Sequence, residues 1–86
     1  MAKKIRGGKF TTQKEYEDIL DRDPKRNRIL TNVSIVNLGM DEVHVIINEG
    51  DEIPISPNET LTLGDLIIDK IVIKEEGSII KYLGVE

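Results

Sequence analysis

The chain has 86 residues, no cysteine, one histidine and a formal net charge of −4. This length corresponds to one domain, and the composition excludes disulfides, thiolate metal sites and histidine-cluster metal sites. No run approaches the roughly 18 apolar residues that a membrane-spanning helix needs, and the basic N-terminus lacks the apolar stretch of a secretory signal. We therefore expect a soluble protein that is assembled inside the cell and makes no membrane contact.

Charge is distributed unevenly along the chain. Residues 1–28 carry nine lysines and arginines against five acids, whereas residues 29–86 carry three against eleven. The first segment is therefore basic and the second is strongly acidic. Such a division between two parts of one chain indicates an electrostatic partner.

Residues 1–11 predict a basic extended arm. They contain four cations, no acid and two adjacent glycines, and such a composition is typical of a mobile segment. Apolar residues near the two ends of the arm could anchor it on a neighbouring subunit. The candidate partner-binding residues of the arm are Lys3, Lys4, Ile5, Arg6, Lys9 and Phe10.

Residues 12–28 predict one short helix followed by a linker. Thr12 and Glu15 have the spacing of a capping box. Tyr16, Ile19 and Leu20 then follow at the spacing of one helical stripe, so we expect a helix over about 12–21 that ends before Pro24. A helix this short needs a surface to pack on.

Residues 29–86 predict an antiparallel β domain. Short β-branched runs alternate with polar turns, and the predicted strands lie within 29–38, 42–48, 52–56, 60–63, 66–75 and 78–85. Residues 56–59, Ser-Pro-Asn-Glu, suit a type I turn. The expected fold is mainly β, a small antiparallel β-sandwich or barrel of about six strands, preceded by the basic arm and the short helix.

Several predicted strands are apolar on both faces. Val43, Val45 and Ile47 share one face of their strand, yet Ile46 lies on the other. A half-buried strand alternates more cleanly, so the second face needs a cover. The predicted helix could cover part of it, but we favour a partner chain, and the candidate sheet residues for that contact are Val36, Ile46 and Val72.

No residue pattern predicts catalysis, a cofactor or a metal ion. His44 lacks a neighbouring nucleophile and an orienting group in the sequence pattern. The acids lie mostly at turns without the spacing of a twelve-residue calcium loop, and Gly7-Gly8 lacks the spacing of a phosphate loop. We therefore expect a protein that is not an enzyme and has no small-molecule substrate.

Residues 32–86 resemble the small β-sandwich structural proteins of tailed-bacteriophage virions. The resemblance rests on five short elements: Asn37-Leu-Gly39, Val45-Ile-Ile-Asn48, Pro57-Asn-Glu59, Ile71-Val-Ile73 and Tyr82-Leu-Gly84-Val85. It covers about two thirds of the chain. It implies a virion part, of the capsid-decorating or head–tail joining type, and it implies no catalytic residue.

The leading hypothesis is a non-enzymatic structural subunit of a tailed-phage virion, assembled in the bacterial host cytoplasm. We expect a capsid decoration protein whose arm binds the major capsid protein or copies of itself. A neck or tail position, with a neck protein as partner, is the close alternative. A different class of function is a nucleic-acid-binding accessory protein that acts through residues 3–28. A small ligand-binding barrel ranks last because aliphatic side chains leave little room for a cavity.

Overall fold

The protein is built almost entirely from β-strands. A computed structural model describes residues 3–22 and 29–86. These residues form eight strands in two four-stranded antiparallel sheets, together with one 3₁₀ helix and no α-helix. The prediction of a mainly β, antiparallel fold is therefore confirmed.

Each sheet combines strands from distant parts of the chain. The first sheet has the order β1 (Ile5–Thr11), β8 (Ile79–Val85), β3 (Thr31–Asn37) and β6 (Thr60–Thr62). The second has the order β2 (Glu17–Asp18), β7 (Ile71–Ile73), β4 (Val43–Ile47) and β5 (Glu52–Ile55). The chain passes repeatedly from one sheet to the other, and among the strands of the described residues only β4 and β5 form a hairpin of consecutive paired strands.

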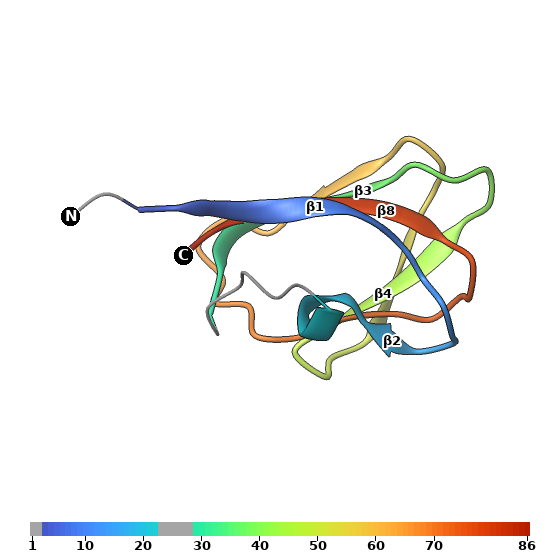
Figure 1. Ribbon diagram of the computed structural model, residues 1–86, viewed down its shortest axis with the longest axis horizontal. Coiled ribbons are helices and arrows are strands. Elements are labelled where there is room, and N and C mark those ends of the chain that lie inside the picture. Colours follow the sequence, from blue (N-terminus) through green and yellow to red (C-terminus); the bar gives the residue numbers. More distant parts are fainter. Residues whose placement is uncertain (1–2, 23–28) are drawn as a thin grey trace.

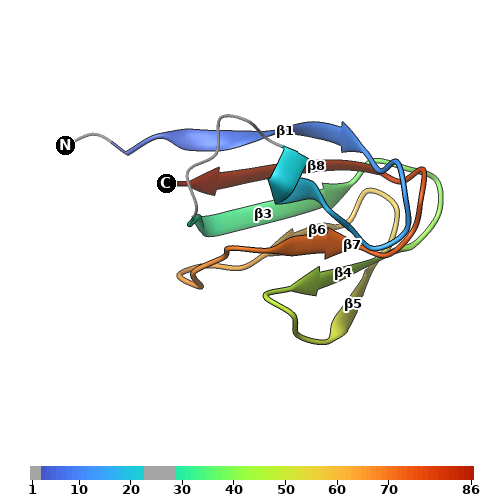
Figure 2. The same cartoon turned by 60° about the horizontal axis from the view of Figure 1, so that its bottom comes forward.

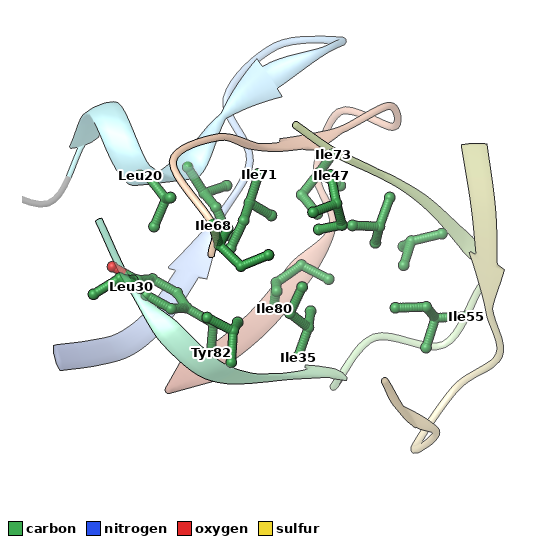
Figure 3. Close-up of a cluster of buried hydrophobic side chains, with 14 residues drawn as sticks. Leu20, Leu30, Ile35, Ile47, Ile55, Ile68, Ile71, Ile73, Ile80 and Tyr82 are labelled. Carbon is green, nitrogen blue, oxygen red and sulfur yellow. The ribbon is translucent and has the colours of Figure 1, made fainter. Parts of the chain in front are cut away.

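The two sheets lie in separate layers, with β1, β3 and β8 in one and β2 and β4 in the other (Figure 1), and β1, β8 and β3 follow one another within the first sheet (Figure 2). Aliphatic side chains from both layers fill the space between them (Figure 3). Tyr82 is the largest fully buried side chain. At one corner, Leu30 and Ile68 exchange backbone hydrogen bonds of 2.9 and 2.7 Å, which joins the segment before β3 to the segment before β7.

Asparagine residues shape the turns between predicted strands. Asn48 and Glu49 both have positive φ, and the Gly50 N–H donates to the Ile47 carbonyl, which is the pattern of a type I′ hairpin turn. In the turn of residues 56–59, the φ of +66° at Asn58 is typical of a type II turn. The predicted turn is present there, but its expected type I geometry is wrong.

The predicted helix over about 12–21 is absent. Tyr16 has a φ of +53°, which is incompatible with a continuing α-helix, and Glu17 and Asp18 pair with β7 as strand β2. The hydroxyl of Thr12 donates to the Glu75 carbonyl at 2.7 Å and accepts from the Ser78 N–H at 2.8 Å, so it does not cap a helix. A ten-residue helix is marginal on its own, whereas the 3₁₀ helix η1 (Ile19–Arg22) begins with two fully buried apolar residues. The linker expected around Pro24 lies outside the described residues.

The N-terminal segment is not a separate arm. Residues 5–11 are extended, as expected, but they form β1, which pairs with β8 in unbroken register from Ile5–Val85 to Thr11–Ile79. Beyond the strand, Lys4 and Glu86 exchange two further backbone hydrogen bonds. Pairing satisfies one side of the β1 backbone, and a free arm would leave those groups to water. The basic segment is thus an edge strand of the first sheet (Figure 2).

Candidate interaction surfaces

The six predicted arm residues divide into two groups. Phe10 points inward, where its ring stacks on Tyr82 with 5.6 Å between centroids. Arg6 Nε bonds the Glu86 carboxylate at 3.1 Å, with both side chains mostly covered. Phe10 therefore packs against the core, and Arg6 is already held within its own chain. Lys3, Lys4, Ile5 and Lys9 are exposed.

The outward side of the first sheet is the first candidate surface. Because Phe10, Ile80 and Tyr82 face the core, strand alternation turns the intervening residues outward. We call this surface the lysine face and define it by its outward residues Ile5, Lys9, Val36, Lys81 and Leu83. Leu83 is 45% exposed and Ile5 is 72% exposed. The surface therefore combines apolar side chains with lysines.

Two lysines oppose each other at the centre of the lysine face. The register pairs Lys9 of β1 directly with Lys81 of β8, and Lys81 in turn lies opposite Val36 of β3. Within residues 3–22 and 29–86, neither lysine forms an ion pair. Like charges on directly opposite residues of two neighbouring strands destabilise the pairing of those strands. Next to this pair, Ser34, Val36, Lys81 and Leu83 line a shallow depression of about 110 Å³.

The outward side of the second sheet is the second candidate surface. The predicted sheet residues Ile46 and Val72 are direct cross-strand partners there, between β4 and β7. Val72 in turn opposes Asp18, and Ile46 opposes Glu52, so an apolar pair is bordered by acids on both edge strands. Val36, the third predicted sheet residue, lies on the other sheet. The prediction therefore named residues of two separate surfaces.

A cleft of about 540 Å³ opens over Ile46 and Val72. It merges with a second, more polar depression, because both are bordered by Asp18, Asp21, Glu49 and Lys70. We call the two together the acidic cleft. Five acids and two lysines line it among the described residues: Glu17, Asp18, Asp21, Glu49, Asp69, Lys14 and Lys70. Lys70 lies 3.4 Å from Glu49, and among the described lining residues the acids still outnumber the lysines.

The local structure that builds the acidic cleft depends on two side chains. The Glu17 carboxylate accepts from the Gln13 N–H at 2.6 Å, which shapes the turn before β2. The Asn48 amide donates to the Ile67 carbonyl at 2.7 Å and accepts from the N–H groups of Asp69 and Lys70. Asn48 therefore fixes the loop before β7 along one wall of the cleft. From the sequence, Asn48 is predicted only as the end of the strand within 42–48.

His44 belongs to a carboxylate cluster at the outward side of β4. Its Nδ1 lies 2.6 Å from Glu75 Oε2, its backbone N–H donates to Glu75 Oε1 at 2.7 Å, and its Nε2 lies 3.5 Å from Glu42. Burial is the largest influence on Glu75 and raises its pKa. The hydrogen bonds from the His44 backbone and ring, with the attraction of the ring, outweigh it and leave the pKa of Glu75 below its usual value. The cluster ties β4 to the segment that follows β7.

A metal centre has no support in the described part of the chain. No group of three or more histidine, cysteine, aspartate or glutamate side chains is placed to hold an ion in residues 3–22 and 29–86. Within the same residues, no helix has the length and apolar character to span a membrane.

The fold and these surfaces define a small two-sheet β protein with one apolar, lysine-bearing face and one acidic cleft. Comparisons with protein-family models, curated proteins and solved structures find no match to this chain. Inferences about its function therefore depend on its own residues.

Proposed function

We propose that this protein is a non-enzymatic structural subunit of a tailed-bacteriophage virion, attached to the capsid as a decoration protein. The lysine face carries the proposal, because it exposes apolar side chains beside two lysines that no acid of the described chain pairs with. Exposed apolar patches bordered by polar groups are typical of protein-binding surfaces. The resemblance of residues 32–86 to virion β-sandwich proteins supports the proposal that this assembly is a virion.

The architecture is compatible with such a passive role. We infer that the two sheets form a β-sandwich, since core side chains from both sheets pack into one cluster. In this proposal the protein binds through preformed sheet faces, and not through the free arm that the sequence predicts. The neighbours on these faces are the major capsid protein, a neck protein or further copies of the chain.

The composition of purified particles tests the proposal. Tailed particles are purified from the bacterial host whose DNA encodes the chain, and their proteins are quantified by mass spectrometry. We expect the chain in the particles at a copy number close to that of the most abundant shell protein. A few copies per particle would instead support the neck or tail position. A chain that is abundant in the lysate but absent from purified particles would overturn the virion assignment.

A matched pair of variants links incorporation to the lysine face. Lys9→Glu combined with Lys81→Glu reverses the central charges, and we expect the doubly substituted chain to be lost from the particles. Met40→Glu adds negative charge at a 93% exposed residue that is not part of this face, and this control chain should be incorporated normally. Equal incorporation of both chains would show that the lysine face is not the binding surface.

A nucleic-acid-binding role through residues 3–28 is the competing class. The exposed Lys3, Lys4 and Lys9 favour it, but the burial of Phe10 removes an aromatic ring that could stack on a base. Residues 23–28 lie outside the described part of the chain. DNA affinity that falls steeply with salt and disappears in Lys9→Glu would favour this class over the structural one.

A further inference from the structure

The two candidate surfaces of one chain complement each other. The lysine face presents Lys9 and Lys81 beside the apolar side chains of Val36 and Leu83. The acidic cleft presents carboxylates around an apolar floor formed by Ile46 and Val72. Each surface therefore has an apolar centre next to charges of one dominant sign, and the two signs are opposite. This arrangement favours contact between the two surfaces by both charge pairing and apolar burial.

The two surfaces of one molecule cannot meet each other, because they lie on the outward sides of different sheets with the core between them (Figure 1). A second copy of the chain supplies the missing surface. We propose that the lysine face of one copy binds in the acidic cleft of the next. The proposal rests on the structural role proposed above, and it names the neighbour in that assembly.

The central lysine pair gives a specific reason why a second copy of the chain, with its acidic cleft, binds the lysine face. Lys9 and Lys81 lie directly opposite, where like charges repel and weaken strand pairing. A contact that brings carboxylates to both ammonium groups relieves that repulsion. Glu49 is suited to this contact because its side chain is 77% exposed at the border of the cleft and its only described ion pair is with Lys70 at 3.4 Å.

The symmetry of the contact follows from its two unlike halves. A contact between two different surfaces is heterologous, so an open row of copies always keeps one unoccupied face at one end and one unoccupied cleft at the other. Association therefore continues beyond a dimer until a ring closes or an open filament forms. A dimer with two-fold symmetry would require the face and the cleft of one copy to meet the cleft and the face of the other at the same time, and surfaces on the outward sides of two different sheets cannot do so.

Sedimentation velocity of the purified full chain tests the proposal. We expect the average mass to increase with protein concentration at about 50 mM salt and to return to that of a monomer at about 500 mM salt. Lys81→Glu and Glu49→Lys should each weaken this association at least about tenfold. Met40→Glu and Asp65→Lys introduce a negative and a positive charge at exposed positions outside the two surfaces and should leave the association unchanged.

A mixture of the two charge-reversed variants is the decisive experiment. In the mixture, the reversed face of one variant meets the reversed cleft of the other, and the two unaltered surfaces also meet. We therefore expect an equimolar mixture of Lys81→Glu and Glu49→Lys to regain association beyond a dimer. A folding defect in either variant could not be rescued in this way, and thermal melting of each variant checks that it is folded. Lys81→Gln and Glu49→Gln replace any variant that fails to fold, and each should weaken association without reversing the charge.

Three results would overturn the inference: a wild-type chain that stays monomeric at low salt, association that stops at a dimer, or a mixture that is not rescued. Binding of the lysine face to duplex DNA in place of a second copy would also overturn it. These results are separable from the proposed function. A monomeric chain that still enters purified virions fails only the self-association, whereas a chain absent from virions fails the virion assignment.

Discussion

The ring of Phe10 stacks on the ring of Tyr82, with 5.6 Å between their centroids and 20° between their planes. Tyr82 is fully buried in β8, and Phe10 packs against the core from the edge strand β1. This contact anchors the basic N-terminal segment to the centre of the molecule. It makes residues 5–11 part of the fold, although their charge and glycine content are typical of a mobile arm.

Removal of the Phe10 ring should destabilise the whole domain. Phe10→Ala loses both buried apolar area and the aromatic contact, and because Phe10 is only partly buried we expect a cost of about 2–3 kcal/mol in the free energy of unfolding. Urea unfolding followed by circular dichroism measures this cost. Ile5→Ala, on the same strand but 72% exposed, should change stability by less than about 0.5 kcal/mol. Equal effects of both variants would mean that β1 does not contribute to the core.

The adjacent glycines of β1 should respond very differently to alanine. A Cβ at Gly7 would overlap the Tyr82 carbonyl oxygen and lie 2.9 Å from the Leu83 Cα, so β1 would have to move away from β8. We expect Gly7→Ala to cost about 1–3 kcal/mol. A Cβ at Gly8 meets only the Phe10 ring, at 3.6 Å, and Gly8→Ala should be neutral or slightly stabilising. Thermal melting distinguishes the two, and a more stable Gly7→Ala variant would contradict the close approach of the strands.

Strand positions in residues 29–86 were predictable from local patterns. Each of the six predicted runs contains a strand, because alternation of apolar and polar residues directly reflects which side of a strand meets the core. The fifth predicted run was less accurate than the others. The run 66–75 contains only the three-residue strand β7, because Asn48 holds the preceding residues in a loop.

Residues 3–22 were predicted only in part, because their structure depends on distant partners. The spacing of Tyr16, Ile19 and Leu20 fits a helical stripe, yet the burial of Ile19 and Leu20 is achieved by a 3₁₀ turn after β2. Strand β1 exists because β8, at the opposite end of the chain, pairs with it. Local propensity carries no information about such pairing.

The candidate surfaces were predictable only in part. Alternation correctly placed Ile46 and Val72 on the outward side of their strands, but it could not reveal that they are neighbours. The opposition of Lys9 and Lys81 likewise depends on the register between the first and last strands. Register is set by the three-dimensional pairing of distant strands, so residues that form one surface remain scattered in the sequence.

Asn37 should be essential for joining the two sheets. Its fully buried amide donates to the carbonyls of Asp41 and Ile55, at 2.8 and 3.0 Å, and its oxygen accepts from the Gly39 N–H at 2.9 Å. It thus links β3 of the first sheet to β5 of the second. Asn37→Ala leaves these three backbone groups without that partner, and we expect a loss of about 2–4 kcal/mol.

Urea unfolding tests the role of Asn37 against a second asparagine. Asn58→Gly replaces an exposed turn residue whose φ is +66°, a conformation that glycine adopts readily, so its stability should change little. Asn37→Ala with wild-type stability would show that the amide does not hold the sheets together.

The His44 cluster should make stability depend on acidic pH through Glu75. Hydrogen bonds and charge attraction from His44 outweigh burial and lower the Glu75 pKa below its ordinary value of 4.5. A carboxyl whose pKa is lower in the folded state binds protons more readily when the chain is unfolded. Its stabilising contribution is therefore complete above the unfolded pKa and is lost as the pH falls through the lowered folded pKa.

The pH profile of Glu75→Gln isolates this contribution. The variant keeps the shape of the side chain but loses its charge, and we expect it to be about 1–2 kcal/mol less stable than wild type at pH 7. The difference between the two proteins should shrink steadily as the pH falls below about 4.5, because wild type then loses the same charge by protonation. Glu42→Gln is the control, since the Glu42 carboxylate is more exposed and lies farther from the ring, at 3.5 Å. Urea midpoints measured from pH 7 to pH 3 provide the comparison, and a Glu75→Gln deficit that stays constant over this range would show that the stabilisation does not depend on the Glu75 charge.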